Sequence, residues 1–571
     1  MAALSALAGL VIVRIALLLS LAVNPFLLTR LFAPRATRLF ALALSGAVAL
    51  GLNTAIPVAL VWAGKPITSE TLAWSHWVLA GILGLAMLLR SLPVLPGKTG
   101  ALKSILNAAA VCAVAVLPFT HMPGYDTYKV QDAATAVGVT GAIPWMIHPV
   151  SLFGFGPRAY CAGPSLLLAT IQILGGLGVD WGFFLLSLVS GLTGLFAAAL
   201  LGERLLGSRK MGFWYALLYV TSPTFLAHNH WAIGRGLYLS LLPLFLYAAF
   251  AKSWMRRIIF VPLAGVGLAL CHRMGTVTVP LVAPMLLVGS FLPRVRRRAV
   301  PVALLAVAAL AGWMLVPGAN PIARTAMGLF RVGSRLGMVA PLAVLGVVAT
   351  RSFAMRRAWR SMLLAGLCIA PLAFGDDDYG SMALLPFATL AAAMGLRRLM
   401  LSKATRGFVF RAAVTVVLLL SVARLATRSF NATSNDLYEA ARFLDAYDPV
   451  GPYRLEGPSL ARQRLQGYVT GCPGFEVNAT PDARPTFRLP PIPEGSLRKK
   501  LDAWVEYGRN LVRVSDARVD WYGKDPRTYY LVVADSGKPP KETRLVFESG
   551  SVRIFEPNDQ SPPTAIGGPA P

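Results

Sequence analysis

The sequence is poor in charged residues. Only 14% of its 571 residues are charged, whereas 56% are hydrophobic and the mean hydropathy is +0.60. Soluble domains average about 25% charged residues, so this composition excludes an ordinary soluble protein. Apolar segments long enough to cross about 30 Å of hydrocarbon recur from the N-terminus to about residue 425. We therefore expect a polytopic, α-helical integral membrane protein of the cell (inner or cytoplasmic) membrane.

Acidic residues are also scarce, with 26 Asp and Glu against 54 Lys and Arg, which gives a net charge of +28. The basic residues are not gathered on one soluble module, so the charge does not indicate a nucleic-acid partner. They occur instead in short clusters between apolar runs, as in the cytoplasmic loops of membrane proteins. These clusters lie at 30–38, 90–103, 204–210, 252–257, 294–298, 351–360 and 397–406.

Cysteine is rare, with five residues that form no CxxC pair and no His/Cys group of zinc-binding spacing. This excludes a zinc-ribbon or thioredoxin-like site. Cys161 and Cys472 both fall in polar segments that the topology below places outside the cytoplasm. A disulfide between them and two unpaired thiols are both open alternatives.

The spacing of the basic clusters predicts the topology. Each interval between clusters has room for two spans and a turn, so cytoplasmic clusters imply about 14 spans with both termini outside. The apolar segment 165–179 is too short for a crossing, and we expect it to lie on or dip into the outer face. Large outer loops are then expected at 119–180 and 318–337.

The character of the chain changes after residue 425. A transmembrane domain over 1–425 is followed by a predicted extracytoplasmic α/β domain over 426–558 and a disordered tail over 559–571. Within that domain, 435–447 has the apolar spacing of an amphipathic helix. The stretches TYYLVVA, RLVFES and SVRIFEP predict short strands.

The first outer loop carries an acidic motif. The stretch GYDTYKVQDAATA is followed by a Gly/Pro-containing segment with LLLATIQILGG, then by a span ending in ERLLGSRK and one ending in TSP. This layout resembles the GT-C superfamily of membrane glycosyltransferases, which use polyprenyl-phosphate sugars. Asp126 with Thr127 and Tyr128 is similar to the second half of the D-x-D-P-Y-Y-H-like motif of oligosaccharyltransferase catalytic subunits. Gly124 replaces the first acid, and a WWD-like motif is missing, which argues against transfer to asparagine.

Asp126 is the predicted catalytic residue. A carboxylate at the outer membrane surface can deprotonate an acceptor hydroxyl, or it can hold a divalent cation, Mg²⁺ or Mn²⁺, against the phosphate leaving group. Tyr125 and Tyr128 are predicted to stack on a sugar or to hold the loop at the interface. The alternative is that Asp126 only caps a short helix, because Asp is a preferred N-cap. Asp132, further along the same predicted helix, is expected to be an ordinary exposed acid.

Further polar groups collect at predicted outer span ends and in the two predicted outer loops. Candidates for binding the lipid phosphate are Arg235, His272, Arg273, Arg324, Arg331 and Arg335, with His148 and Arg158 as weaker ones. Asp376 and Asp378 are candidate metal ligands beside Asp126, and a solvated turn is the alternative. His228 and His230 form a weaker candidate metal pair. Simple anchoring at head-group level competes with phosphate binding for the arginines and His272.

The resemblance implies a membrane glycosyltransferase that moves a sugar from a polyprenyl-phosphate or diphosphate carrier to an extracytoplasmic glycolipid, polysaccharide or protein. A transporter or flippase is one alternative, but the predicted spans contain few interior charges apart from Arg14 and Arg411. The other alternative is a scaffold whose C-terminal domain binds envelope-assembly partners. The expected partners of the enzyme are the lipid-linked donor and membrane lipids.

Overall fold

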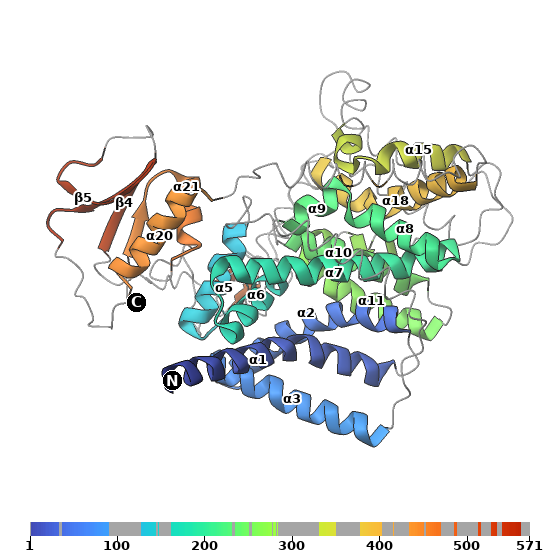
Figure 1. Cartoon of the computed structure of the whole chain (residues 1–571), viewed down its shortest axis with the longest axis horizontal. Coiled ribbons are helices and arrows are strands. Elements are labelled where there is room, and N and C mark those ends of the chain that lie inside the picture. The colour runs from blue at the N-terminus through green and yellow to red at the C-terminus, as the bar shows by residue number, and fades with distance from the viewer. Residues whose placement is uncertain are drawn as a thin grey trace.

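The computed structural model of the chain is a helical bundle with a small sheet domain at one end (Figure 1). The structure describes residues 2–33, 37–90, 127–143, 147, 161–230, 234–250, 254–276, 278–280, 282–283, 331–349, 377–401, 415, 419, 433–449, 453–469, 485–487, 512–514, 527–533 and 539–560. Tyr125, Asp126, Arg324 and Asp376 lie outside these residues, as do His148, Arg158 and Cys472.

Five helices of the described residues are long and apolar enough to cross a membrane. At 1.5 Å per residue, each of them can cover about 30 Å of hydrocarbon. They are α1 (Ala2–Phe32), α2 (Arg38–Trp62), α3 (Ser69–Arg90), α7 (Val179–Leu206) and α18 (Asp377–Leu401). The structure thus supports a multi-pass helical protein, while the total of about 14 spans stays a prediction.

The basic helix ends gather at one side of the bundle. Arg90 at the end of α3 donates to the Leu31 carbonyl of α1 over 2.9 Å. Arg204 at the end of α7 donates to the Phe250 carbonyl over 3.0 Å. At the opposite ends of α2, α3 and α7, exposed tryptophans occur, namely Trp62, Trp74, Trp77 and Trp181. Exposed Trp is typical of the membrane interface, so the two groups indicate the two faces.

Shorter helices complete the bundle. They are α5 (Thr127–Thr140), α6 (Ala162–Gly175), α8 (Arg209–Val220), α9 (Pro223–His230), α10 (Gly234–Ala249), α11 (Trp254–Cys271) and α15 (Val339–Ala349). Helix α6 corresponds to the apolar segment that we expected at the outer face. It has 14 residues, is almost entirely buried, and packs against α1, α2, α5 and α7. It therefore dips into the bundle and does not lie on its surface.

The C-terminal domain matches the predicted elements. Helix α20 (Asn435–Tyr447) buries Leu437, Ala440, Ala441 and Leu444, as its spacing predicted. The three predicted strands are confirmed as β4 (Arg527–Val533), β5 (Thr543–Ser549) and β6 (Val552–Pro557). With β1 (Tyr453–Glu456) they form a sheet in the order β1-β4-β6-β5, in which only the β1–β4 pair is parallel.

The remaining elements of this domain are α21 (Ser459–Gln466) and a separate antiparallel pair, β2 (Pro485–Phe487) with β3 (Val512–Val514). The exact domain boundaries at 426 and 558 stay a prediction.

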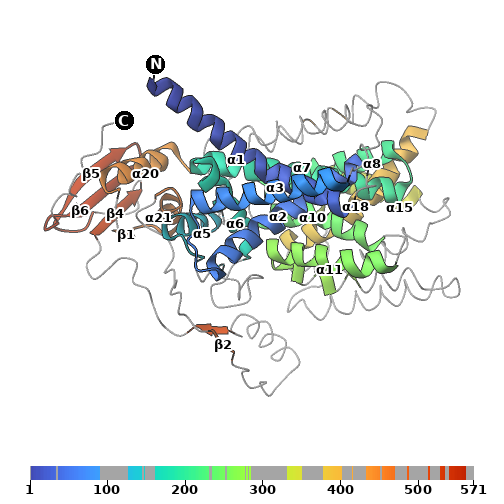
Figure 2. The ribbon, with the colours of Figure 1, turned by 90° about the horizontal axis from the view of Figure 1, so that it is seen from below.

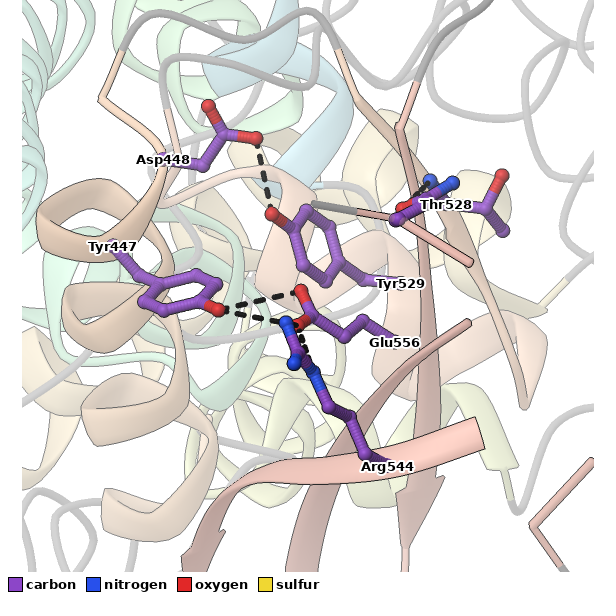
Figure 3. A network of polar contacts seen from close by, with 7 residues as sticks. Tyr447, Asp448, Thr528, Tyr529, Arg544 and Glu556 are labelled. Atoms are coloured by element: carbon purple, nitrogen blue, oxygen red, sulfur yellow. Dashed lines mark hydrogen bonds and ion pairs between the residues drawn. The ribbon is translucent and has the colours of Figure 1, made fainter. Parts of the chain in front are cut away.

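A polar network fastens α20 to the sheet (Figure 3). Glu556 of β6 is 1% exposed, forms an ion pair with Arg544, and accepts a hydrogen bond from the Tyr447 hydroxyl over 3.2 Å. Nearby, the Tyr529 hydroxyl donates to Asp448 over 3.1 Å. Buried carboxylates need such partners, so this network stabilises the domain internally.

Candidate functional site

A cationic cluster forms where five segments of the bundle meet. We define it as Arg235 at the start of α10, His272 and Arg273 just after α11, Arg335 before α15, His228 in α9, and Tyr379 in the first turn of α18. Four of these residues were predicted candidates: Arg235 at one outer span end, His272 and Arg273 at another, and Arg335 in the second outer loop. The structure brings them together.

Local sequence signals explain how the segments reach this place. Helix α8 stops at Val220, and Pro223 opens α9 at a position where a missing N–H costs nothing. The Ser222 hydroxyl accepts a hydrogen bond from the Phe225 amide over 3.2 Å and so caps the new helix. The resulting break turns His228 toward the start of α10.

Gly234 allows α10 and α11 to approach each other. A Cβ atom at this position would collide with the Cys271 carbonyl oxygen and lie 3.4 Å from the Pro164 ring. Only glycine permits such a close backbone contact. It sets Arg235 beside His272, which is one residue beyond α11.

Ring and cation contacts define the geometry of the cluster. The Arg235 guanidinium lies over the Tyr379 ring, 5.2 Å from its centroid, within the range of a cation–π contact. The His272 ring lies 5.6 Å from the same tyrosine ring and 6.2 Å from the ring of Tyr238. Tyr379 therefore holds both groups from the side of α18.

The segment that carries Arg335 is attached to α9. The Thr224 hydroxyl donates to the Arg335 carbonyl over 3.0 Å, and Gly337 adopts a positive φ of 58° against the Pro223 ring. Arg331, one turn earlier, is exposed. The fixed backbone at 335 places this arginine close enough to act electrostatically on His228.

Electrostatics make the two histidines neutral members of the cluster. Burial, followed by the charges of Arg235 and Arg273, lowers the pKa of His272 to about 3. The pKa of His228 is also well below its ordinary value, chiefly because of burial and then because of Arg235. Both rings are thus uncharged at neutral pH, and the positive charge of the cluster comes from its arginines.

The start of α6 adjoins the cluster. Cys161, which precedes α6, is a buried free thiol, and burial raises its pKa to about 12 although the nearby charge of Arg273 opposes this. Cys161 therefore forms no disulfide in the structure. The start of α6 is thus close enough to Arg273 for its charge to act on the Cys161 thiol.

The catalytic role predicted for Asp126 and the metal-binding role predicted for Asp126, Asp376 and Asp378 are not tested by the structure. Asp126, Tyr125, Arg324 and Asp376 are outside the described residues, and Asp378 lies in α18 without a described side chain. Within the described part of the chain, no three His, Cys, Asp or Glu side chains are grouped as metal ligands. His228 and His230 are two residues apart on a helix and do not face the same direction.

The predicted binding residue Tyr128 is buried, with 7% of its surface exposed. Lys129 extends over its ring at 5.8 Å. The ring therefore does not offer an open face for stacking on a sugar, and any binding role for it stays a prediction. Tyr379, in contrast, was not predicted to belong to the site. The sequence signal for this position was the neighbouring acids in GDDDYG, which were predicted as candidate metal ligands.

The expectation that Asp132 is exposed is wrong. We expected Asp132 to be an ordinary solvent-exposed carboxyl, but it is 3% exposed and its Oδ1 atom has no hydrogen-bond partner. Burial raises the pKa of Asp132 well above its ordinary value. Helix α5 is covered by α6 and α21, so its polar residues do not form a solvated face.

This burial predicts a pH effect on stability. Because the folded pKa is raised above the unfolded value of 3.8, the folded protein binds the extra proton, and stability falls as pH rises from that value toward the folded pKa. We expect Asp132→Asn to remove a slope of about 1.4 kcal/mol per pH unit in that window. Thermal unfolding of both proteins between pH 5 and pH 8 measures the difference. Parallel pH curves for the two proteins would contradict it.

Comparison with known proteins adds one structural likeness. No protein-family model matches the chain, and no curated protein matches it either. A solved structure similar to the chain is that of ArnT from Cupriavidus metallidurans bound to undecaprenyl phosphate. The alignment has a TM-score of 0.47 and 14% identity, and it covers 80% of this chain and 98% of that one. A likeness of this size assigns neither fold nor function, so the site is interpreted from its own geometry.

Proposed function

We propose that the protein is a membrane glycosyltransferase that transfers a sugar from a polyprenyl-phosphate or diphosphate carrier to an extracytoplasmic acceptor. The observation that supports this most directly is the meeting of Arg235, Arg273 and Arg335 around two neutral histidines. Guanidinium groups bind phosphate through paired, charge-assisted hydrogen bonds. The cluster is therefore suited to the phosphate of a lipid carrier.

The position of the cluster supports the same function. The His228 end of α9 packs on the first half of α7, where the Asn229 amide donates to the Ser187 carbonyl over 3.1 Å. The basic end of α7, at Arg204, is the opposite end of this helix. If basic ends face the cytoplasm, the cluster lies toward the extracytoplasmic side, where a flipped lipid-linked sugar is available.

Binding of polyprenyl phosphate to the purified protein tests this proposal. We expect Arg235→Gln to weaken binding by about tenfold, because a hydrogen bond between charged groups is lost. Arg235→Lys should recover part of the affinity, since it keeps the charge without the planar fork. Arg209→Gln is the matched control, because Arg209 is an exposed arginine at the basic end of the bundle.

The matched ligand for this experiment is polyprenol, which has the same chain without phosphate. Wild-type protein should prefer the phosphate strongly. Equal binding of the two lipids, or equal binding by wild type and Arg235→Gln, would contradict the proposal. Addition of sugar-loaded carrier and candidate acceptors then measures transfer itself.

One observation favours the transporter alternative. His76 lies fully buried within α3, and its carbonyl accepts a hydrogen bond of 2.8 Å from the Asn24 amide of α1. Ionisable side chains inside membrane spans commonly mark transport pathways. Movement of a labelled lipid-linked sugar across reconstituted vesicles, with no transferred product, would identify this second function.

A further inference from the structure

The C-terminal domain is attached directly to the membrane part of the protein. Tyr468, just after α21, donates a hydrogen bond from its hydroxyl to Oδ1 of Asp180 over 2.7 Å. Asp180 lies in the first turn of α7, and these residues are 288 positions apart in sequence. In both views of the ribbon, α21 lies beside α5, between the sheet and the bundle (Figures 1 and 2).

The hydrogen bond between Tyr468 and Asp180 closes a series of contacts that joins α21, α5, α6 and α7. Helix α21 packs on α5, and α5 is joined to α6 by reciprocal hydrogen bonds between Gln131 and Gln172 of 2.8 Å and 3.3 Å. Gln172 in turn packs against Gly182 of α7, only two residues from Asp180. The path therefore runs from α21 through α5, α6 and α7 and returns to Tyr468.

The contact is built to be strong. Tyr468 is 9% exposed, and the Tyr438 ring of α20 packs edge-on against it at 5.2 Å and 79°. Hydrogen bonds to a carboxylate are stronger than neutral ones, and a carboxylate in the first turn of a helix is favoured by the helix dipole. Tyr468 is thus held from both sides, by its own domain and by α7.

We propose that the Asp180–Tyr468 hydrogen bond holds the C-terminal domain against α5 and makes Tyr468 a positioning residue for sugar transfer. The inference rests on the proposed function, because α5 begins at Thr127, directly after the predicted catalytic Asp126. The domain would then serve as a fixed wall against α5. Its role would be to keep α5 in one position relative to the cationic cluster.

Hydrogen exchange of the full-length protein tests the attachment without any activity assay. We expect the amides of residues 127–140 to exchange about tenfold faster in Tyr468→Phe and in Asp180→Ala, because local opening becomes easier. The double variant should exchange no faster than either single one, since both remove the same bond. Tyr447→Phe is the matched control, because it removes a tyrosine–carboxylate bond inside the domain.

Kinetics with a polyprenyl-linked sugar test the positioning role. We expect Tyr468→Phe to lower kcat severalfold with little change in KM for the lipid donor, because the cluster that binds phosphate is built from other elements. Unchanged exchange of α5 in both single variants would overturn the attachment. Faster exchange with unchanged kcat would overturn the positioning role. Slower exchange of α5 in wild type than in the variants, combined with no sugar transfer by wild type, would instead overturn the proposed function. The positioning role would then fall with it, while the attachment of the domain would stand.

Discussion

Replacement of Asp126 by asparagine is expected to lower sugar transfer by about 10²–10⁴-fold while the protein remains folded and inserted. A general base typically contributes a rate factor of this size, and a metal ligand contributes several kcal/mol. Asparagine has nearly the same shape but neither accepts a proton at neutral pH nor binds a cation with a full charge. The measurement is the rate of transfer from a synthetic polyprenyl-linked sugar.

The choice of asparagine separates catalysis from helix capping. Asp126 directly precedes Thr127, the first residue of α5 that the structure describes, and the alternative role predicted for it is that of an N-cap. Asparagine caps helices as well as aspartate does, and the capping alternative therefore predicts almost no change. If Asp126→Asn keeps more than about a tenth of wild-type activity, the acids at Asp376 and Asp378 become the next candidates.

A suitable control for this experiment must be an exposed acid. Asp132 does not qualify, because it is buried in α5 and its substitution is expected to change stability. Glu70 in the first turn of α3 is exposed and lies beside the turn that joins α2 and α3. Glu70→Gln should leave the transfer rate unchanged.

Features set by local sequence were predictable. Helix α20 begins and ends at the residues expected from its apolar spacing, because one face of it packs on a sheet. The strands β4, β5 and β6 follow from their β-branched and aromatic residues. The long apolar helices follow from the length that a bilayer requires.

Features set by packing between distant segments were not predictable. The sequence indicated Arg235, His272 and Arg335 as separate candidates, but their meeting depends on how α9, α10 and α11 pack. Asp132 was wrongly expected to be exposed, because Lys129, Gln131 and Asp132 look like a solvated helix face in sequence. Helix α5 is covered by α6, which holds Gln131 through Gln172, and by α21, which comes more than 300 residues later in the chain.

One glycine decides whether the cluster can assemble, and its replacement is the second large effect that we expect. In Gly234→Ala the new methyl group would meet the Cys271 carbonyl oxygen, which is backbone and cannot rotate away. Overpacking of this kind typically costs about 1–3 kcal/mol, and we expect the upper end because helix ends must separate. Separation moves Arg235 away from His272, so polyprenyl phosphate binding should weaken together with stability.

Gly267→Ala provides the matched control within the neighbouring helix α11. A Cβ atom there would lie 3.7 Å from the nearest atom, Cδ1 of Leu241, which is an ordinary contact. Alanine is a better helix former than glycine, so this variant should be as stable as wild type or up to about 1 kcal/mol more stable. Thermal unfolding and polyprenyl phosphate binding are measured for both variants. The comparison distinguishes a general effect of replacing glycine by alanine from the specific effect of disrupting the contact at Gly234. Equal stability and equal binding in the two variants would mean that the α10–α11 contact does not position Arg235, and the cluster would then need another structural cause.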